Sequence, residues 1–439
     1  MKYSQFNSII PYNNKFALYN ALEKKVVFLE PELKNILEQE IQNGIDNLIN
    51  IHPDFCNYLS ANDFLIKNDK DEIAEIKKIV YTIDENKKRY DLTINPTINC
   101  NFKCWYCYET HVKQSKMNSD TINRIHKFIL KQAQNEELEE FNLSFFGGEP
   151  LLFFQKNVIP IIDEFVLIMK NFNKQFEIGF TTNGYLINDR FLNYFNEKQL
   201  KPHFQITLDG YRENHDKVRF VSPTKGSYTT ILNNIRKLVE NEMFVRVRIN
   251  YTDENIEDTH KIAEDLSNIE KQMTKKYLMI DFHRVWQNNK LDDIDVIVDK
   301  NVEIIRKKGY NVKSSSYCND TVRGSCYADK RNSAVINYNG DVFKCTARDF
   351  TTRNREGFLT NEGEIVWENN APERRMKAKF NNRPCLLCRL LPVCNGACTQ
   401  QALEHLGEKD YCIHSFNETE KDKVIKAMVD VIMHGNETT

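Results

Sequence analysis

Twelve cysteines constrain this chain more than any other feature of its sequence, because eleven of them fall into two groups. Residues 1–5 are not followed by the apolar stretch of a signal peptide, so we expect an unsecreted, cytoplasmic protein. In a large unsecreted chain, clustered cysteines bind metal or do chemistry more often than they form disulfides. The two groups are Cys100, Cys104 and Cys107, then Cys318, Cys326, Cys345, Cys385, Cys388, Cys394, Cys398 and Cys412.

The rest of the composition is that of an ordinary folded protein. With 439 residues, the chain is long enough for about three domains of roughly 150 residues each. Lys and Arg number 60 against 62 Asp and Glu, a net charge of −2, which gives no bulk attraction to nucleic acid or anionic membranes. No apolar run approaches the roughly 18 residues of a membrane-spanning helix. We therefore expect neither a nucleic-acid partner nor a membrane.

From about residue 91 the sequence alternates between apolar strand patterns and amphipathic helix patterns. This repetition predicts an α/β fold with a parallel sheet and helical crossovers, either an open sheet or an incomplete barrel. Functional groups of such folds gather at the carboxyl ends of the strands. The expected strands are 90–95, 142–146, 177–182, 203–208, 245–251 and 277–284, and the clearest helices are 121–132, 158–169, 228–239 and 259–269.

The two ends of the chain differ from this middle part. The N-terminal residues predict a short hairpin (16–21 and 25–29), helices near 33–48 and 52–59, and a strand at 64–66. Beyond about 310, short strands at 333–337, 342–344 and 365–367 alternate with turns and closely spaced cysteines. This pattern indicates a segment that is stabilised by bound metal. We expect three domains, at 1–90, 91–310 and 311–439.

The first cysteine group has the spacing C-x3-C-x2-C and comes straight after the first strand of the repeat. A tetrahedral zinc site takes four ligands, and a fully protein-bound cubane cluster takes four cysteines. Three thiolates on one loop therefore leave one coordination position of the metal site for water or a substrate. The alternative is a structural site completed by a distant His or Cys.

This spacing after the first strand of a βα repeat resembles the radical S-adenosylmethionine (radical SAM) enzymes, whose core is a partial (β/α)6 barrel. The resemblance implies that Cys100, Cys104 and Cys107 hold a [4Fe–4S] cluster whose fourth iron binds S-adenosylmethionine. It also implies that the backbone of Tyr106 meets the adenine. In that family, reductive cleavage of S-adenosylmethionine gives a 5′-deoxyadenosyl radical that abstracts hydrogen from a C–H bond.

Further family motifs follow in order at the ends of the later strands. Taken singly, each of them is more often an ordinary turn or strand end. Asp209 is a candidate general base by position alone, and its alternatives are a contact to S-adenosylmethionine or a turn former. The cofactor contacts that the resemblance implies are Gly147, Gly148, Glu149 and Pro150 (the GGEP motif), Thr182, Asn183, Thr207, Arg219, Arg248 and Phe282.

The second cysteine group alone would suggest a pair of zinc knuckles. Its full spacing resembles the SPASM extension of radical SAM enzymes, which binds two auxiliary [4Fe–4S] clusters and so implies three clusters in all. The resemblance assigns four ligands to one cluster and three to the other, with Cys318 as the natural fourth ligand of the latter. If Cys318 does not ligate, that cluster keeps an open iron. The two sets are Cys385, Cys388, Cys394 and Cys412, and Cys326, Cys345 and Cys398.

SPASM enzymes commonly modify peptides, and residues 1–90 resemble the winged-helix element that binds the leader of a precursor peptide. The layout therefore resembles maturases of ribosomally made peptides that form a C–C, C–O or thioether crosslink, of the kind paired with an ATP-grasp ligase. A flavodoxin or ferredoxin would donate electrons. One alternative is an anaerobic sulfatase-maturating enzyme, which forms formylglycine. An alternative of another class is a zinc-stabilised binding protein without catalysis.

Overall fold

The computed structural model describes residues 1–288, 294–314, 321–405 and 410–435. Contacts group the chain into two compact units. The first unit combines Met1–Glu85, Tyr317–Lys330 and Pro372–Thr439, and the second combines Asn86–Ser316 and Arg331–Ala371. None of the described helices is both long enough and apolar enough to cross a bilayer.

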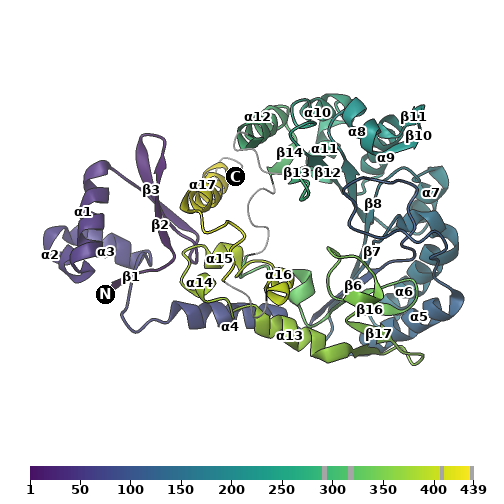
Figure 1. Cartoon of the computed structure of the whole chain (residues 1–439), viewed down its shortest axis with the longest axis horizontal. Helices are drawn as coiled ribbons and strands as arrows, with labels where there is room; N and C mark the ends of the chain where they lie inside the picture. The colour runs from purple at the N-terminus through teal and green to yellow at the C-terminus, as the bar shows by residue number, and fades with distance from the viewer. Residues whose placement is uncertain (289–293, 315–320, 406–409, 436–439) are drawn as a thin grey trace. The chain divides into compact units, whose positions relative to one another are not determined.

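An eleven-stranded sheet runs through the described part of the second unit (Figure 1). Its strands pair in parallel from β14 through β15 and antiparallel beyond β15, which confirms the predicted parallel sheet. The order across the sheet is β14 (Asn311–Ser314), β13 (Leu278–Arg284), β12 (Val245–Tyr251), β9 (His203–Leu208), β8 (Gln175–Thr182), β7 (Glu140–Phe145), β6 (Arg89–Ile94), β15 (Ser333–Ile336), β16 (Asp341–Phe343), β17 (Gly357–Leu359) and β18 (Ile365–Trp367).

Helices connect the successive parallel strands and cover the outer face of the curved sheet (Figure 1). In α5, Ile122, Ile125 and Ile129 recur at helical spacing and are buried against the sheet, and the Asn118 side chain caps the first turn. The helix expected at 259–269 is shorter than predicted. The main helices are α5 (Ser119–Ala133), α6 (Ile159–Asn171), α7 (Asp189–Glu197), α9 (Tyr228–Glu240), α10 (Lys261–Asp265), α11 (Lys271–Tyr277) and α12 (Ile294–Lys307).

Alternation along the strands separates an apolar outer face from a polar inner face. In β6, Tyr90, Leu92 and Ile94 are buried in the core beneath the helices, while Asp91 and Thr93 lie between them in sequence and point the other way. The same alternation in neighbouring strands places Asn142, Gln205, Thr207, Arg248, Asn250, Asp281 and His283 on the inner face. A sheet built this way keeps its main core outside and presents polar groups inside.

Residues 331–371 extend this sheet at its β6 edge. β15 pairs in parallel with β6, with Val335 opposite Thr93, and the strands through β18 continue the sheet from there. Val335 also joins Ile98, Phe343 and Phe350 in a small buried cluster. The predicted short strands in this region are therefore part of the central sheet, and their cluster supports the loop that carries Cys100.

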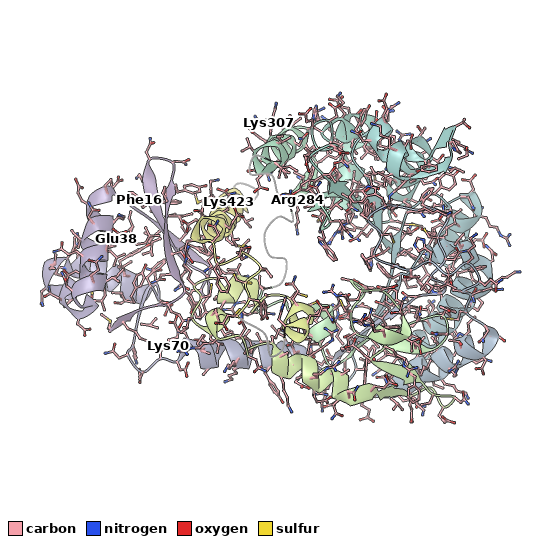
Figure 2. The ribbon with its side chains drawn as sticks, viewed as in Figure 1. Phe16, Glu38, Lys70, Arg284, Lys307 and Lys423 are labelled. Atoms are coloured by element: carbon pink, nitrogen blue, oxygen red, sulfur yellow. The ribbon has the colours of Figure 1, made fainter. Side chains whose placement is uncertain are left out.

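The first unit contains a three-stranded antiparallel sheet, so the predicted hairpin is confirmed and β2 adds a third strand. One face packs against helices, because the partly buried Phe16, labelled in Figure 2, packs against the buried cluster that includes Leu37 of α1. The helix predicted at 33–48 ends at Asn43, because Gly44 adopts φ 120°. The elements are β1 (Lys2–Tyr3), β2 (Asn7–Tyr12), β3 (Lys15–Asn20), β4 (Lys25–Leu29), β5 (Leu65–Ile66), α1 (Pro31–Asn43), α2 (Leu48–Ile51), α3 (Pro53–Ala61) and α4 (Glu72–Asp84).

The other face of this small sheet packs against the C-terminal part of the chain. Phe6 and Tyr19 share one core with Val322, Leu391 and Val424, so all three segments of the first unit contribute to it. The C-terminal helices are α13 (Ala371–Ala378), α14 (Arg383–Leu386), α15 (Leu391–Cys394), α16 (Thr399–Glu404) and α17 (Glu418–Gly435). The N-terminal residues therefore have one core of their own, which includes Leu37, and share a second core with the C-terminal part.

Candidate functional site

The first cysteine group lies on the loop after β6, at the carboxyl ends of the parallel strands. Cys100 and Cys104 are half-buried against the main core, whereas Cys107 is exposed. The Phe102 amide donates to Cys100 Sγ over 3.4 Å. The Cys107 amide donates to the Cys104 carbonyl over 3.1 Å, which tightens the second half of the motif.

These three thiols fit an iron–sulfur cluster by their donor chemistry. Burial raises the pKa of Cys100 to about 12, so this thiol is protonated until a metal replaces the proton. Among the described residues, no three His, Cys, Asp or Glu side chains converge as they would around a single metal ion. Each cysteine of a cluster binds its own iron, and soft thiolates are the ligands that such clusters take.

The hydroxyl of Tyr106, between the second and third cysteines, is the centre of a buried hydrogen-bond network. It donates to Asp209 Oδ1, and it accepts from Arg219 Nη2 over 2.9 Å and from Asn250 Nδ2 over 3.0 Å. Burial raises the pKa of Tyr106 above its usual value, so the phenol is neutral. The cysteine loop is thereby tied to the ends of β9 and β12.

The candidate base Asp209 is one half of a buried ion pair. Its Oδ2 accepts from Arg219 Nε, and the two side chains are 1% and 11% exposed. The Asp209 amide donates to His215 Nδ1, and His215 in turn contacts Ser227, whose hydroxyl donates to the Arg219 carbonyl over 2.7 Å. Both oxygens of Asp209 are therefore engaged, which favours positioning of Tyr106 as its role over proton transfer.

The backbone of the GGEP motif packs closely against the cysteine loop. Gly148 adopts φ 42°, and a Cβ built there would lie 2.2 Å from the Asn99 carbonyl oxygen. The Glu149 amide donates to that same oxygen over 2.8 Å. The Gly148 amide donates to Glu109 Oε2 over 2.6 Å. Only glycine allows this approach, so the sequence Gly-Gly positions the loop that carries the thiols.

The carboxylate of Glu149 joins the motif to the end of β8. It is fully buried and accepts from Thr182 Oγ1 over 2.7 Å, from the Asn183 amide over 2.8 Å and from the Leu151 amide over 2.9 Å. The Asn183 side chain then donates to Asn101 Oδ1 over 2.8 Å, beside the first cysteine. Glu149 and Asn183 therefore fix the cysteine loop from the side of β8.

The structure brings the other predicted residues to the same end of the sheet, although one side chain points away from the inner face. Thr207 and Arg248 are register partners on the inner face, and Arg248 Nε donates to Asn250 Oδ1 over 2.9 Å. Pro150 is buried at the start of the turn after GGEP. The side chain of Phe282 is fully buried in the core under the helices, so it does not reach the polar inner face.

Two functional contacts were not singled out from the sequence. Asn250 follows Arg248 by two residues and so lies on the same face of β12, a spacing that could have identified it. No comparable spacing in the sequence marks Glu109. Burial raises the pKa of Glu109 to about 7, and its carboxylate accepts from the Gly148 amide, which joins the cysteine loop to the GGEP turn.

We expect Gly148→Ala to displace the cysteine loop, because the new Cβ would overlap the Asn99 carbonyl. Gly309→Ala is the matched control, since Gly309 also has positive φ (89°) but has no atom within 4 Å of a built Cβ. Both variants should lose about 1–2 kcal/mol to backbone strain. Only Gly148→Ala should lose the iron that the first cysteine group binds. Equal iron content after reconstitution would contradict this role.

Four cysteines of the second group line one cavity of about 130 Å³ in the first unit. Burial, together with the neighbouring thiols, raises the pKa of Cys385 to about 11. Asn382 Nδ2 donates to Cys385 Sγ over 3.0 Å. This set matches the ligands that the resemblance assigns to one auxiliary cluster, namely Cys385, Cys388, Cys394 and Cys412.

The other auxiliary set is distributed over the two units. Cys326 and Cys398 belong to the first unit, and Cys345 belongs to the second. Cys326 and Cys345 are half-buried, and Cys398 is exposed. Cys318 lies outside the described residues. Ligation by these cysteines stays a prediction.

Comparison with known proteins identifies the protein family that the domain with the central sheet matches. Residues 94–266 match the family model described as Radical SAM superfamily, so the chain contains a radical SAM domain. A cysteine-type anaerobic sulfatase-maturating enzyme from Clostridium novyi is 31% identical over 158 residues, which cover 34% of this chain and 41% of that enzyme. The chain spans about two fifths of the length of the first curated relatives that it matches.

Solved structures show the same fold over longer stretches. The anaerobic sulfatase-maturating protein anSMEcpe with bound AdoMet matches with a TM-score of 0.55 and 16% identity, over 78% of this chain and 99% of that one. SuiB from Streptococcus suis bound to S-adenosylmethionine matches with a TM-score of 0.53 and 16% identity. That match covers 93% of this chain and 97% of SuiB, so it includes most of both units.

Proposed function

We propose that this protein is a radical SAM enzyme that forms an intramolecular C–C, C–O or thioether crosslink in a ribosomally made precursor peptide. The observation that carries the proposal is the loop with Cys100, Cys104 and Cys107, fixed at the polar end of the parallel sheet. When bound there, a [4Fe–4S] cluster and S-adenosylmethionine would supply the radical that removes hydrogen from a C–H bond.

The chain's own contribution is to hold the cofactor loop in one geometry. Tyr106 and its partners tie the loop to β9 and β12, and Glu149 ties it to β8. Gly148 lets the GGEP backbone approach closely. Rigid support of this kind keeps a reactive group aligned with its target. Asp209 as a proton acceptor stays a weaker proposal, because both of its oxygens are engaged.

We also propose two auxiliary [4Fe–4S] clusters in the C-terminal part, one of them in the cavity lined by Cys385 and its three neighbours. The clusters would accept or donate an electron when the crosslink closes, with a flavodoxin or ferredoxin as the external donor. Anaerobically purified protein should then carry about twelve irons for three [4Fe–4S] clusters. Colourless protein with zinc would favour the non-catalytic binding protein instead.

A peptide substrate is supported by the likeness to SuiB. A structure of SuiB bound to its precursor peptide SuiA matches over 93% of this chain. Within the described residues, β4 pairs with β3 alone, which leaves its other edge to take an added peptide strand. We propose that residues 1–90 bind the leader in this way, and that an ATP-grasp ligase acts on the same peptide.

The leader proposal can be tested with prolines at two successive positions of β4, Val26 and Val27. Successive amides of a strand point to opposite edges, so only one of the two prolines removes a donor from the free edge. That variant should bind the precursor at least about tenfold more weakly, a change of about 1.4 kcal/mol, with unchanged thermal unfolding. The other variant, in which the proline removes the donor on the side of β3, should lose stability. Wild-type affinity in both variants would contradict the proposal.

A sulfatase-maturating activity is the second candidate, favoured by the 31% identical relative. One experiment separates the two. The reduced enzyme is incubated with the product of a neighbouring short reading frame and, separately, with a sulfatase peptide whose target residue is cysteine. A crosslink removes two hydrogen atoms and keeps the sulfur, whereas oxidation of cysteine to formylglycine loses the sulfur. Mass spectrometry of each peptide therefore identifies the reaction.

A further inference from the structure

A buried ammonium group joins the three segments of the first unit at one point. Lys379 is 3% exposed, and its Nζ lies 2.8 Å from Asp84 Oδ2, 2.6 Å from Ser325 Oγ and 3.1 Å from Asp329 Oδ2. Asp84 is the last residue of α4, whereas Ser325 and Asp329 come from the segment Tyr317–Lys330. Lys379 itself follows α13.

Burying the charges of this network costs too much free energy for the network to be explained as ordinary core packing. Asp84 and Asp329 are 3% and 4% exposed, so two carboxylates and one ammonium have been removed from water. Burying charges costs several kcal/mol per ion, and well-packed apolar side chains of the same volume usually stabilise a protein as much or more. The position of Lys379 therefore calls for a role beyond stability.

The partners of Lys379 flank two of the predicted auxiliary-cluster ligands. Ser325 directly precedes Cys326. Thr399 directly follows Cys398, and its hydroxyl donates to Asp329 Oδ2 over 2.8 Å. The loops that carry the two cysteines are therefore attached to the same ammonium, one directly and the other through Asp329.

The backbone beside each cysteine is in a conformation that needs such support. Ser325 has φ 53° and Ala397 has φ 71°, the left-handed region that residues with a side chain rarely adopt. Gly396, with φ 74°, would place a Cβ 2.7 Å from the Lys379 carbonyl oxygen. Strained residues persist only where the surroundings fix them. Loss of the network would let both loops relax.

We propose that Lys379 is a positioning residue for the auxiliary cluster that Cys326 and Cys398 are predicted to bind. Its ammonium sets the separation of the two cysteine-bearing loops through Ser325 on one side and through Asp329 and Thr399 on the other. This inference rests on the proposed function only for the presence of that cluster. In the described part of the chain, Lys379 Nζ bonds to Asp84, Ser325 and Asp329 and not to the cysteines that line the cavity with Cys385, so we expect the cluster of those cysteines to be retained.

The test compares charge-removing variants at the two ends of one helix. Asp84→Asn removes a partner of Lys379 at the end of α4. Glu72→Gln is the matched control, because Glu72 is a buried carboxylate (7% exposed) at the start of α4 that accepts from Ser4 Oγ and the Gln5 amide. Lys379→Met removes the ammonium itself, and Thr399→Val removes a single hydrogen bond.

After anaerobic reconstitution, Lys379→Met and Asp84→Asn should each lose about four irons per chain, the content of one [4Fe–4S] cluster. Thr399→Val should keep its iron but shift the midpoint potential of one cluster. Glu72→Gln should match the wild type in both readouts. Cleavage of S-adenosylmethionine should persist in all four variants. If Lys379→Met does not fold, Asp84→Asn tests the loss of iron and Thr399→Val tests the shift in midpoint potential.

Two results would overturn the inference. One is wild-type iron content and unchanged midpoint potentials in all the variants at the network. The other is an equal loss of iron in Asp84→Asn and Glu72→Gln, which would show a general effect of stability. Failure of the auxiliary-cluster proposal looks different, because the wild-type protein itself would then lack the four irons that the variants are expected to lose.

Discussion

Replacing Cys100, Cys104 and Cys107 together by alanine is expected to abolish the formation of 5′-deoxyadenosine from S-adenosylmethionine. The three thiols are the only cysteines of the first group, and they lie on one loop at the polar end of the sheet. Without them the loop offers no thiolate to iron, so no iron can be left open for S-adenosylmethionine. Product is measured after reduction under anaerobic conditions.

Cys385→Ala is the matched control for this experiment. Cys385 lines the cavity in the first unit and is predicted to bind a different cluster. This variant should still cleave S-adenosylmethionine, although it should stop or strongly reduce formation of the modified peptide. Continued cleavage by the triple variant would show that the ligands of the first cluster have been assigned wrongly. Normal product formation by Cys385→Ala would show that the auxiliary cluster is dispensable.

The second large effect is expected for Arg219→Met. The substitution leaves the Asp209 carboxylate, 1% exposed, without its guanidinium partner. Removing one member of a buried ion pair costs about 3–5 kcal/mol, because the remaining charge is left unpaired. Tyr106 also loses a donor to its hydroxyl, so the affinity for S-adenosylmethionine should fall along with stability. Denaturant unfolding and ligand titration measure the two effects.

A double-mutant cycle shows whether the loss comes from the ion pair. Asp209→Asn combined with Arg219→Met removes both charges and should recover part of the stability that Arg219→Met loses. His215 and Ser227 remain in place to hold the backbone of both residues. A coupling free energy below about 0.5 kcal/mol would mean that the two side chains act independently, which would contradict the buried pair.

Much of the central sheet could be predicted from the sequence, because local patterns determine it. The strand predicted at 203–208 coincides with β9, and that predicted at 245–251 coincides with β12. Apolar residues at every second position give the strand, and the glycine, asparagine and threonine residues that follow it mark the end. The cysteine loop was predictable for the same reason, since its three ligands lie within eight residues.

Other features depend on contacts between distant residues and leave no local signal. The partners of the Tyr106 hydroxyl are more than 100 residues away in sequence. The pairing of β15 with β6 joins a four-residue strand to one about 240 residues earlier. Phe282 was placed at the cofactor by motif order, whereas alternation along β13 turns its side chain toward the helices. Lys379 lies in no motif.

The proposed function requires that the loop at Cys100 holds a cluster with one iron open to S-adenosylmethionine. The most direct measurement is electron paramagnetic resonance of the reduced protein before and after S-adenosylmethionine is added. A Cys385→Ala background reduces the overlap with signals from the auxiliary clusters. We expect the spectrum of one [4Fe–4S] cluster to change when S-adenosylmethionine binds. A spectrum that stays the same, or the absence of any cluster that depends on Cys100, Cys104 and Cys107, would contradict it.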